Sequence, residues 1–168
     1  MQIWACTDGP NQQWTLETGP TITVPPPPPP SPTTNQYIHS TGNAAKCLTA
    51  ASNTDGAAVE IEDCVSGGSA SQSWTIPESE PTLQIFGDMC LDVTGGAAAD
   101  GTPLQIWTCT EGDTNQFWSI SESMIRWEAS CLDLTDGSAT DGNVMQIWVC
   151  TGGPNQEWTL TTGPAALV

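Results

Sequence analysis

A pair of cysteines followed by a Gln-x-Trp triplet occurs three times in this chain, and this repeat constrains the fold most. The first cysteine of each copy precedes leucine, in CLTA, CLDV and CLDL, at Cys47, Cys90 and Cys131. A second cysteine follows seventeen to nineteen residues later, and QSW, QFW or QEW then ends the copy. The period is 40 to 44 residues, and three copies fill residues 35–164. A repeat of this length is one supersecondary unit, which buries its apolar face only against its neighbours.

Each copy contains short segments that are typical of β-strands separated by turns. PLQIWTC (103–109) and VMQIWVC (144–150) alternate apolar and polar residues with period two. Asp-Gly pairs at Asp55, Asp100 and Asp141 precede such segments and are typical of tight turns. No segment shows sustained helical periodicity. We therefore expect an all-β domain in which three units, each of about four strands, form a β-trefoil; a β-sandwich is the alternative, which three copies disfavour.

Two further segments precede the three copies. Residues 1–20 match residues 145–164 at sixteen of twenty positions, so they correspond to the second half of a fourth copy. Residues 25–34, PPPPPPSPTT, cannot join a sheet because proline lacks the N–H donor, and we expect a stiff polyproline II spacer. The expected organisation is a partial repeat at 1–24, a linker at 25–34 and a trefoil at 35–164. The partial repeat is either the tail of a preceding trefoil in a longer precursor or a segment that docks onto another copy.

The seven cysteines fit the same repeat. Pairing within copies predicts the disulfides Cys47–Cys64, Cys90–Cys109 and Cys131–Cys150 and leaves Cys6 unpaired. Closing loops of this length contributes roughly 3 kcal/mol each in the chain-entropy description. Zinc is the competing explanation, but no two cysteines are closely spaced and His39 is the single histidine, so we expect no metal site. Because disulfides persist in oxidising compartments, the cysteines predict a secreted, extracellular protein.

The charge balance argues against two classes of partner. The formal net charge is −17, and Lys46 and Arg126 are the only strongly basic residues. Nucleic acid and anionic membranes both require a basic face, and no apolar run is long enough to span a bilayer. We therefore expect neither nucleic acid nor a membrane as a partner. His39 lacks a nucleophile or acid arranged with it, and we expect it to be polar surface in a turn.

The repeats separate tryptophans expected in the core from tryptophans expected on the surface. The tryptophan of Gln-x-Trp is present in every copy and in the partial repeat, at Trp14, Trp74, Trp118 and Trp158. A large aromatic residue retained in every copy favours core packing. In LQIWTC and MQIWVC, Trp107 and Trp148 lie on the strand face opposite the apolar residues. The first copy has Glu62 at this position, and a position that accepts glutamate lies outside the core, so we expect Trp107 and Trp148 to be exposed.

An exposed indole suits the apolar face of a pyranose, whose hydroxyls then need hydrogen-bonding groups nearby. Asp92 and Asn115 are placed to supply them in the second copy, and Asp133 and Asn155 in the third. The residues of the first copy at the three ligand-like positions are Thr49, Glu62 and Ser71. Since the first copy loses these three together while it keeps its cysteines and Gln-x-Trp, the pattern separates a binding site from its scaffold.

The motifs CLDV…LQIWTC…NQFW and CLDL…MQIWVC…NQEW resemble those of the ricin B-chain-like lectins, also called R-type lectins or carbohydrate-binding module family 13. The resemblance covers residues 35–164 and, as half a copy, residues 1–20. It implies a β-trefoil with one shallow site per copy, for galactose-type sugars or xylan. The sugar-binding residues it implies are Asp92, Gln105, Trp107, Asn115, Gln116, Asp133, Gln146, Trp148, Asn155 and Gln156, with the glutamines in supporting roles. The first copy departs from the pattern, so we expect its site to be silent.

The leading hypothesis is a non-catalytic carbohydrate-binding domain with two shallow sites and no cofactor. Shallow sites bind weakly, and an array of them gains through avidity. Glycoside hydrolysis needs a pair of carboxylates, whereas the repeated motif places one per copy, Asp92 and Asp133. Further trefoil or catalytic domains in a longer precursor are possible partners. The alternative is an extracellular array or filament whose subunits assemble through the partial repeat and Cys6.

Overall fold

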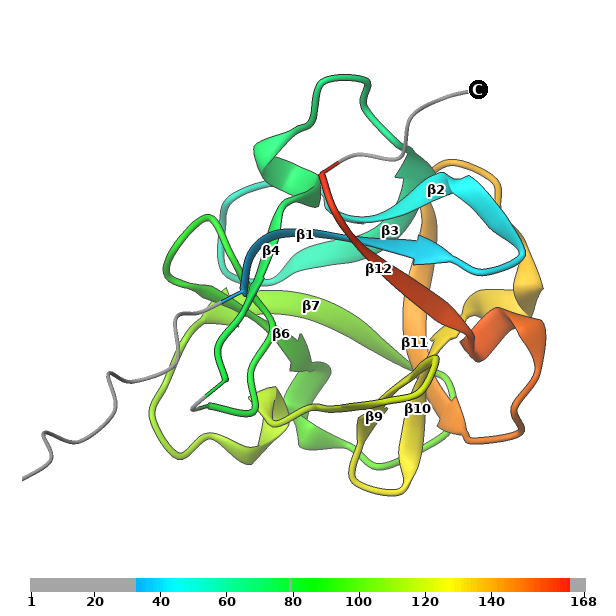
Figure 1. Ribbon diagram of the computed structural model, residues 1–168. Coiled ribbons are helices and arrows are strands. Elements are labelled where there is room, and N and C mark those ends of the chain that lie inside the picture. The colour runs from blue at the N-terminus through cyan, green and yellow to red at the C-terminus, as the bar shows by residue number, and fades with distance from the viewer. Residues whose placement is uncertain (1–32, 79, 164–168) are drawn as a thin grey trace, which may run out of the picture.

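The computed structural model describes residues 33–78 and 80–163, so the predicted partial repeat, its Cys6 and most of the predicted linker lie outside the described residues. Within these residues, twelve strands join in one barrel-like sheet that closes on itself (Figure 1). None of the helices in this part of the chain is long and apolar enough to cross a membrane. The all-β class and the β-trefoil architecture predicted from the repeat are confirmed.

Each repeat contributes four strands to the sheet. The first repeat supplies β1 (Thr33–Ser40), β2 (Asn43–Ala50), β3 (Ala57–Asp63) and β4 (Trp74–Ile76). The second supplies β5 (Gln84–Ile85), β6 (Met89–Val93), β7 (Thr102–Thr108) and β8 (Ser119–Ser121). The third supplies β9 (Met124–Trp127), β10 (Ser130–Leu134), β11 (Asn143–Val149) and β12 (Trp158–Thr162). The 3-10 turns between them are η2 (Ala70–Gln72), η3 (Thr94–Gly96), η4 (Thr114–Gln116), η5 (Thr135–Gly137) and η6 (Pro154–Gln156).

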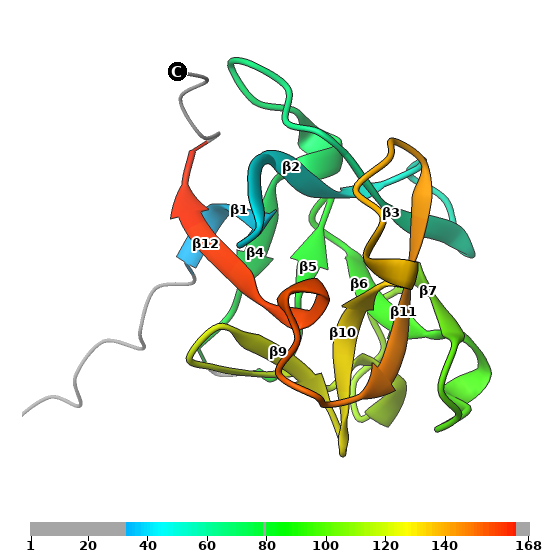
Figure 2. The same cartoon turned by 90° about the vertical axis from the view of Figure 1, so that its right-hand side faces the viewer.

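The three repeats are joined by pairing between their third strands. β3 pairs with β7, β7 with β11, and β11 with β3, all antiparallel. These strands meet around the approximate threefold axis in Figure 1. The first and third repeats also meet where β1 pairs with β12 from Gln36 opposite Thr162 to Ser40 opposite Trp158, side by side in Figure 2. The sheet is therefore complete only when all three repeats are present.

The alternation predicted for β7 and β11 directs apolar side chains inward. Leu104 and Ile106 of β7 are buried in the core, whereas Trp107 is exposed. β11 shows the same alternation, with Met145 and Ile147 buried. Alternate residues of a strand point to opposite faces of a sheet, so one face of each strand packs into the core and the other remains for solvent or ligand.

The three described Gln-x-Trp tryptophans, Trp74, Trp118 and Trp158, are buried, as predicted. The indole Nε1 of each donates a hydrogen bond to the carbonyl of the leucine that follows the first cysteine, at 3.0, 2.9 and 3.0 Å respectively. A buried indole N–H needs such a partner. The contact ties the end of each repeat to its beginning.

The predicted disulfides Cys47–Cys64, Cys90–Cys109 and Cys131–Cys150 are present. Each connects the second strand of a repeat to the residue just after its third strand. One predicted boundary is wrong: the linker was expected to extend to residue 34, but β1 begins at Thr33. Thr33 and Thr34 follow the last proline of the run, so both have the N–H group that a strand requires.

We expect Trp74→Phe to lower the free energy of unfolding by about 2–4 kcal/mol, because the change leaves a cavity and an unpaired Leu48 carbonyl. Urea unfolding followed by circular dichroism measures it. Trp107→Phe is the matched control, and because Trp107 is exposed it should change the free energy by less than about 0.5 kcal/mol. Equal effects from the two substitutions would contradict the assignment of core and surface tryptophans.

Candidate functional site

In the second repeat, the predicted site residues gather on the outer side of the hairpin β6–β7. Asp92 of β6 lies opposite Gln105 of β7. Its Oδ1 accepts a hydrogen bond from Gln105 Nε2 (2.9 Å), and its Oδ2 accepts one from Gln116 Nε2 (3.2 Å). Trp107 follows on the same face of β7 and is 43% exposed. A fixed carboxylate on β6 and an exposed indole on β7 thus share one face of the hairpin, because Trp107 is two residues beyond the partner of Asp92.

The third repeat has the same arrangement on β10 and β11. Asp133 Oδ1 accepts from Gln146 Nε2 (2.8 Å), and Oδ2 accepts from Asn155 Nδ2 (2.7 Å) and Gln156 Nε2 (2.8 Å). Trp148 is 39% exposed. These five side chains line an open hollow of about 200 Å³. Its lining combines these polar side chains with one indole.

Two of the predicted residues, Gln116 and Gln156, lie beneath the carboxylates and are fully buried. Their Oε1 atoms accept from the backbone amides of Thr110 (3.0 Å) and Thr151 (2.7 Å), while their Nε2 atoms hold the aspartates. Because both ends of each amide are engaged inside the protein, these glutamines position the carboxylate. This agrees with the supporting role that the resemblance implies.

The two sites differ in how their asparagine is used. Asn155 donates to the carboxylate of Asp133. Asn115 instead lies against Gly96, where an added Cβ would fall 2.5 Å from Asn115 Oδ1. Of the hydrogen bonds described above, Asp133 in the third repeat therefore accepts three, and Asp92 in the second repeat accepts two.

Sequence reasoning missed two residues that line the third hollow, Asp136 and Thr151. Asp136 has a positive φ of 55°, which aspartate tolerates better than most residues. Gly95 takes its place in the second repeat, so only the third hollow has this additional carboxylate. The sequence signal for Asp136 was the difference between the segments that follow Cys-Leu, which read DVTGG in the second repeat and DLTDG in the third.

Burial raises the pKa of Asp92 above its ordinary value. The hydrogen bonds from Gln105 and Gln116 oppose this effect because they stabilise the charged form, and the nearby charge of Asp113 adds to it. A carboxylate offers about four lone-pair positions. With two of them engaged by glutamine amides, Asp92 retains acceptor capacity for hydroxyl groups of a ligand.

The first repeat has a hollow of about 330 Å³ at the corresponding place, with different chemistry. Gln72 Nε2 donates to Thr49 Oγ1 (3.0 Å), so the scaffold glutamine is kept although the carboxylate is absent. Glu60 and Glu62 line this hollow where the other repeats have glutamine and tryptophan. Burial, and then the charge of Glu62, raise the pKa of Glu60. The first repeat thus offers no aromatic face at this position.

Comparison with known families agrees with this geometry. A family model, the ricin-type beta-trefoil lectin domain, matches residues 81–167, just over half of the chain. The chain belongs to this family. Over 49 residues the chain is 45% identical to Beta-galactoside-specific lectin 2 of Viscum album, and over 53 residues it is 42% identical to Agglutinin of Ricinus communis. The matched segments are 27% and 29% of this chain and only 9% of each relative.

Solved structures share the fold of this lectin domain at low sequence identity. The C-half of the earthworm R-type lectin, in complex with GalNAc, superposes with a TM-score of 0.66 at 19% identity, over 77% of this chain and 98% of that one. Agglutinin from Abrus precatorius gives 0.68 at 18% identity, over 80% and 49%. The designed threefold-symmetric protein ThreeFoil gives 0.62 at 24% identity, over 75% and 97%. At these identities the likeness concerns the fold.

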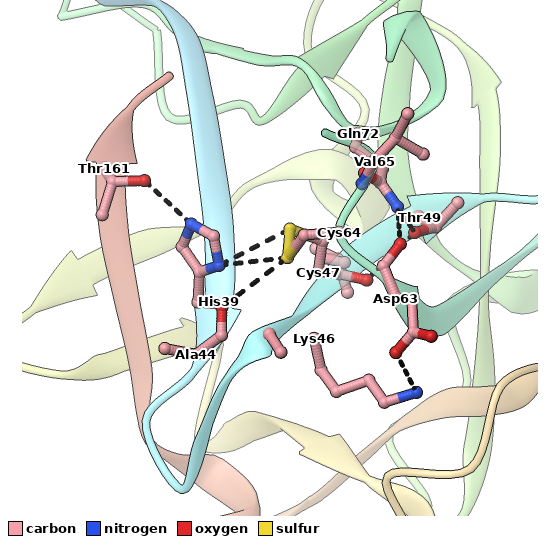
Figure 3. Close-up of a disulfide and its surroundings, with 12 residues drawn as sticks. His39, Ala44, Lys46, Cys47, Thr49, Asp63, Cys64, Val65, Gln72 and Thr161 are labelled. Atoms are coloured by element: carbon pink, nitrogen blue, oxygen red, sulfur yellow. Dashed lines mark hydrogen bonds and ion pairs between the residues drawn. A yellow bond between two sulfur atoms is a disulfide. The ribbon is translucent and has the colours of Figure 1, made fainter. Parts of the chain in front are cut away.

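His39 lies in strand β1 and is buried, so the prediction of polar surface in a turn is wrong. Its Nε2 is 2.8 Å from Thr161 Oγ1 of β12, which covers it from one side. Its Nδ1 is 3.5 Å from Cys47 Sγ and 3.3 Å from Cys64 Sγ (Figure 3). These three side chains are close enough to share a metal ion, but the two sulfurs are bonded to each other and offer no thiolate.

We expect His39 to make the lectin domain less stable as the pH falls from about 7.5 to 5.5, across its ordinary pKa near 6.5. Burial lowers its pKa, partly offset by a hydrogen bond to the backbone of Ala44. The unfolded chain therefore binds the proton more readily, so acid favours unfolding and the stabilisation is complete only above the unfolded pKa. Urea unfolding at both pH values measures the slope.

The control is His39→Gln, since Gln84 lies opposite Cys90 in the second repeat at the register position that His39 takes opposite Cys47. As His39 is the single histidine, this variant should lose the slope. An unchanged slope would mean that another group causes it.

Proposed function

We propose that this lectin domain binds carbohydrate without catalysing a reaction, through two shallow sites in the second and third repeats. One observation carries the proposal. In both repeats an exposed indole shares the outer face of a hairpin with a buried aspartate on the paired strand, and amide donors hold that aspartate: Trp107 with Asp92 and Trp148 with Asp133. The first repeat retains the scaffold glutamine without either group.

The two parts of each site match two different surfaces of a pyranose, its apolar face and its hydroxyl-bearing edge. The C–H groups of one sugar face pack on the indole, and the hydroxyls at its edge donate to the carboxylate lone pairs that the glutamines leave free. Galactose-type sugars or xylan are the proposed ligands. The name of the Viscum album relative, a beta-galactoside-specific lectin, supports the galactose class, as does the GalNAc complex of the earthworm lectin.

Shallow sites leave much of a sugar in water, so each one binds weakly and two sites on one domain gain through avidity. We also propose that the protein is secreted, since its three disulfides persist in oxidising compartments. Assembly into an array through the partial repeat and Cys6 stays a prediction, because both lie outside the described residues.

We expect calorimetric titration with lactose or xylo-oligosaccharides to give about two sites, by the repeat argument above. Trp107→Ala and Trp148→Ala should each remove one site, and the double variant should remove binding while circular dichroism shows an intact fold. Glu62→Ala, at the corresponding position of the first repeat, is the matched control and should leave the stoichiometry unchanged. Binding that persists in the folded double variant would refute the two-site proposal.

We call the sites in the second and third repeats the second and third sites. On acidification, binding at the second site should weaken at a higher pH than the pH at which an exposed aspartate takes up a proton. Because burial raises the pKa of Asp92, its carboxylate takes up a proton above the range near 3.9 where an exposed aspartate titrates. The protonated group loses acceptor capacity and no longer matches the amide donors around it.

A Trp148→Ala background isolates the second site, and titration with sugar at decreasing pH gives its affinity. Asp92→Asn in the same background should bind weakly with little pH dependence. Affinity that stays constant down to about pH 4 would contradict the role of Asp92.

A further inference from the structure

The Asp-Gly turn of the first repeat lies against the binding face of the second. The backbone amide and the hydroxyl of Thr108, the residue after Trp107, both donate to Asp55 Oδ1 (2.7 and 2.9 Å). The amide of Gly56 donates to the carbonyl of Ile106 (2.9 Å), the residue before it. Trp107 is therefore held on both sides by a turn that belongs to the other repeat.

The indole itself also contacts this turn. A Cβ added to Gly56 would lie 3.7 Å from Trp107 Cζ3 and 4.0 Å from Gln105 Oε1, so the glycine lies against the ring and the amide that holds Asp92. Gly56 has a positive φ of 79°, which favours glycine over residues with side chains. The turn supplies both the anchor of the backbone and one wall beside the indole.

The turn of the second repeat has the same relation to the third. Asp100 Oδ1 accepts from the amide of Val149 (2.7 Å), the residue after Trp148. Gly101 donates to the carbonyl of Ile147 (2.9 Å), and its added Cβ would lie 3.7 Å from Trp148 Cζ3. Two independent copies of the contact thus involve the two proposed sugar sites.

The third turn makes the backbone contacts without an indole. Asp141 Oδ1 accepts from the amide of Asp63 (2.9 Å), and Gly142 donates to the carbonyl of Ile61 (3.0 Å). Among the residues that the structure describes, and apart from the chain neighbours of Gly142, no atom lies within 4 Å of a Cβ added there. Lys46 forms ion pairs with Asp63 and Asp141 here. The backbone contacts therefore belong to the scaffold, and the glycine–indole contact belongs to the sites.

We propose that the Asp-Gly turn of each preceding repeat positions the aromatic platform of the next repeat's sugar site. Asp55 and Gly56, in the repeat without an aromatic face, position Trp107, and Asp100 and Gly101 position Trp148. These are positioning residues that act through the indole. As far as affinity is concerned, the inference rests on the proposed sugar binding, whereas the orientation of the indoles does not depend on it.

The physical reason is preorganisation. Trp107 and Trp148 lie near the ends of strands β7 and β11, where solvent replaces a packed neighbour on their outer face. An indole that samples several rotamers must lose that freedom when a sugar packs on it. The Asp-Gly turn fixes the backbone before and after the tryptophan and contacts one side of the ring. Part of the rotamer freedom is therefore already lost before the ligand binds.

The test introduces Asp55→Ala or Asp100→Ala into each of two background variants that retain a single sugar site. In Trp148→Ala, where only the second site remains, Asp55→Ala should weaken the affinity for lactose about fivefold, an effect comparable to the net contribution of one hydrogen bond. Asp100→Ala should leave it unchanged there. In Trp107→Ala, where only the third site remains, the pattern should reverse, with Asp100→Ala weakening the affinity and Asp55→Ala inert.

Conservative replacement and a sugar-free measurement complete the design. Asp55→Asn keeps an Oδ1 acceptor and should restore the affinity to within about twofold. Without sugar, Asp55→Ala should shift the indole ¹H–¹⁵N signal of Trp107 and leave that of Trp148 in place, with signals assigned from the Trp→Phe variants.

The crossed pattern distinguishes positioning from general destabilisation, which would weaken both sites alike. Loss at both sites from either substitution, or an unmoved Trp107 indole signal in Asp55→Ala, would overturn the inference. If no variant binds sugar, the proposed function fails, while the indole signals still decide whether the turn positions the ring.

Discussion

The third strand of every repeat pairs along one edge with the second strand of its own repeat, and along the other edge it needs strands from the other repeats. β7 pairs with β6 inside its own repeat and with β3 and β11 outside it. At each of these joints an Asp-Gly turn accepts and donates backbone hydrogen bonds across the boundary, as Asp55 does for Thr108. A buried strand edge without partners is costly, so the repeats fold as a closed set of three, and the core, the hairpins and the outer faces all depend on that closure.

The scaffold and the proposed sites use separate residues, which explains how one repeat loses a site without losing its fold. Gln72, in the repeat without an aromatic face, hydrogen-bonds the backbone amide of Val65 as its counterparts do in the other repeats. What differs is the acceptor above it, a hydroxyl of Thr49 instead of a carboxylate. Since the glutamine amide is satisfied either way, the substitution leaves no buried polar group unpaired.

The two proposed sites have different chemistry despite their common plan. Asp133 accepts hydrogen bonds from three amide groups, and Asp136 places a second carboxylate in the same hollow. Asp92 accepts two, and the counterpart of Asp136 in its repeat is Gly95, which has no carboxylate. More donors around a carboxylate leave fewer lone pairs free, so Asp133 has less acceptor capacity left than Asp92.

Much of this could be predicted because repeats act as internal controls. Trp74 and Trp107 are the same residue type, yet the first recurs in every copy and is buried, while the second is replaced by Glu62 and is exposed. Such comparisons also indicated the strands, the disulfides and the grouping of Asp92 with Trp107 and Asn115. His39 was misjudged because no other copy has a histidine to compare with it, and its burial depends on β12, which is more than a hundred residues away in sequence.

The sequence by itself determined the all-β class, the threefold plan, the cysteine pairing and which tryptophans face outward, since each follows from period and alternation within one copy. Only the tertiary structure decided what lies next to those outward tryptophans. Gly56 meets Trp107 because β3 pairs with β7, and Asn115 lies against Gly96 whereas Asn155 donates to Asp133. Contacts between repeats depend on how strands pack in three dimensions, and a pattern read along one copy contains no information about that packing.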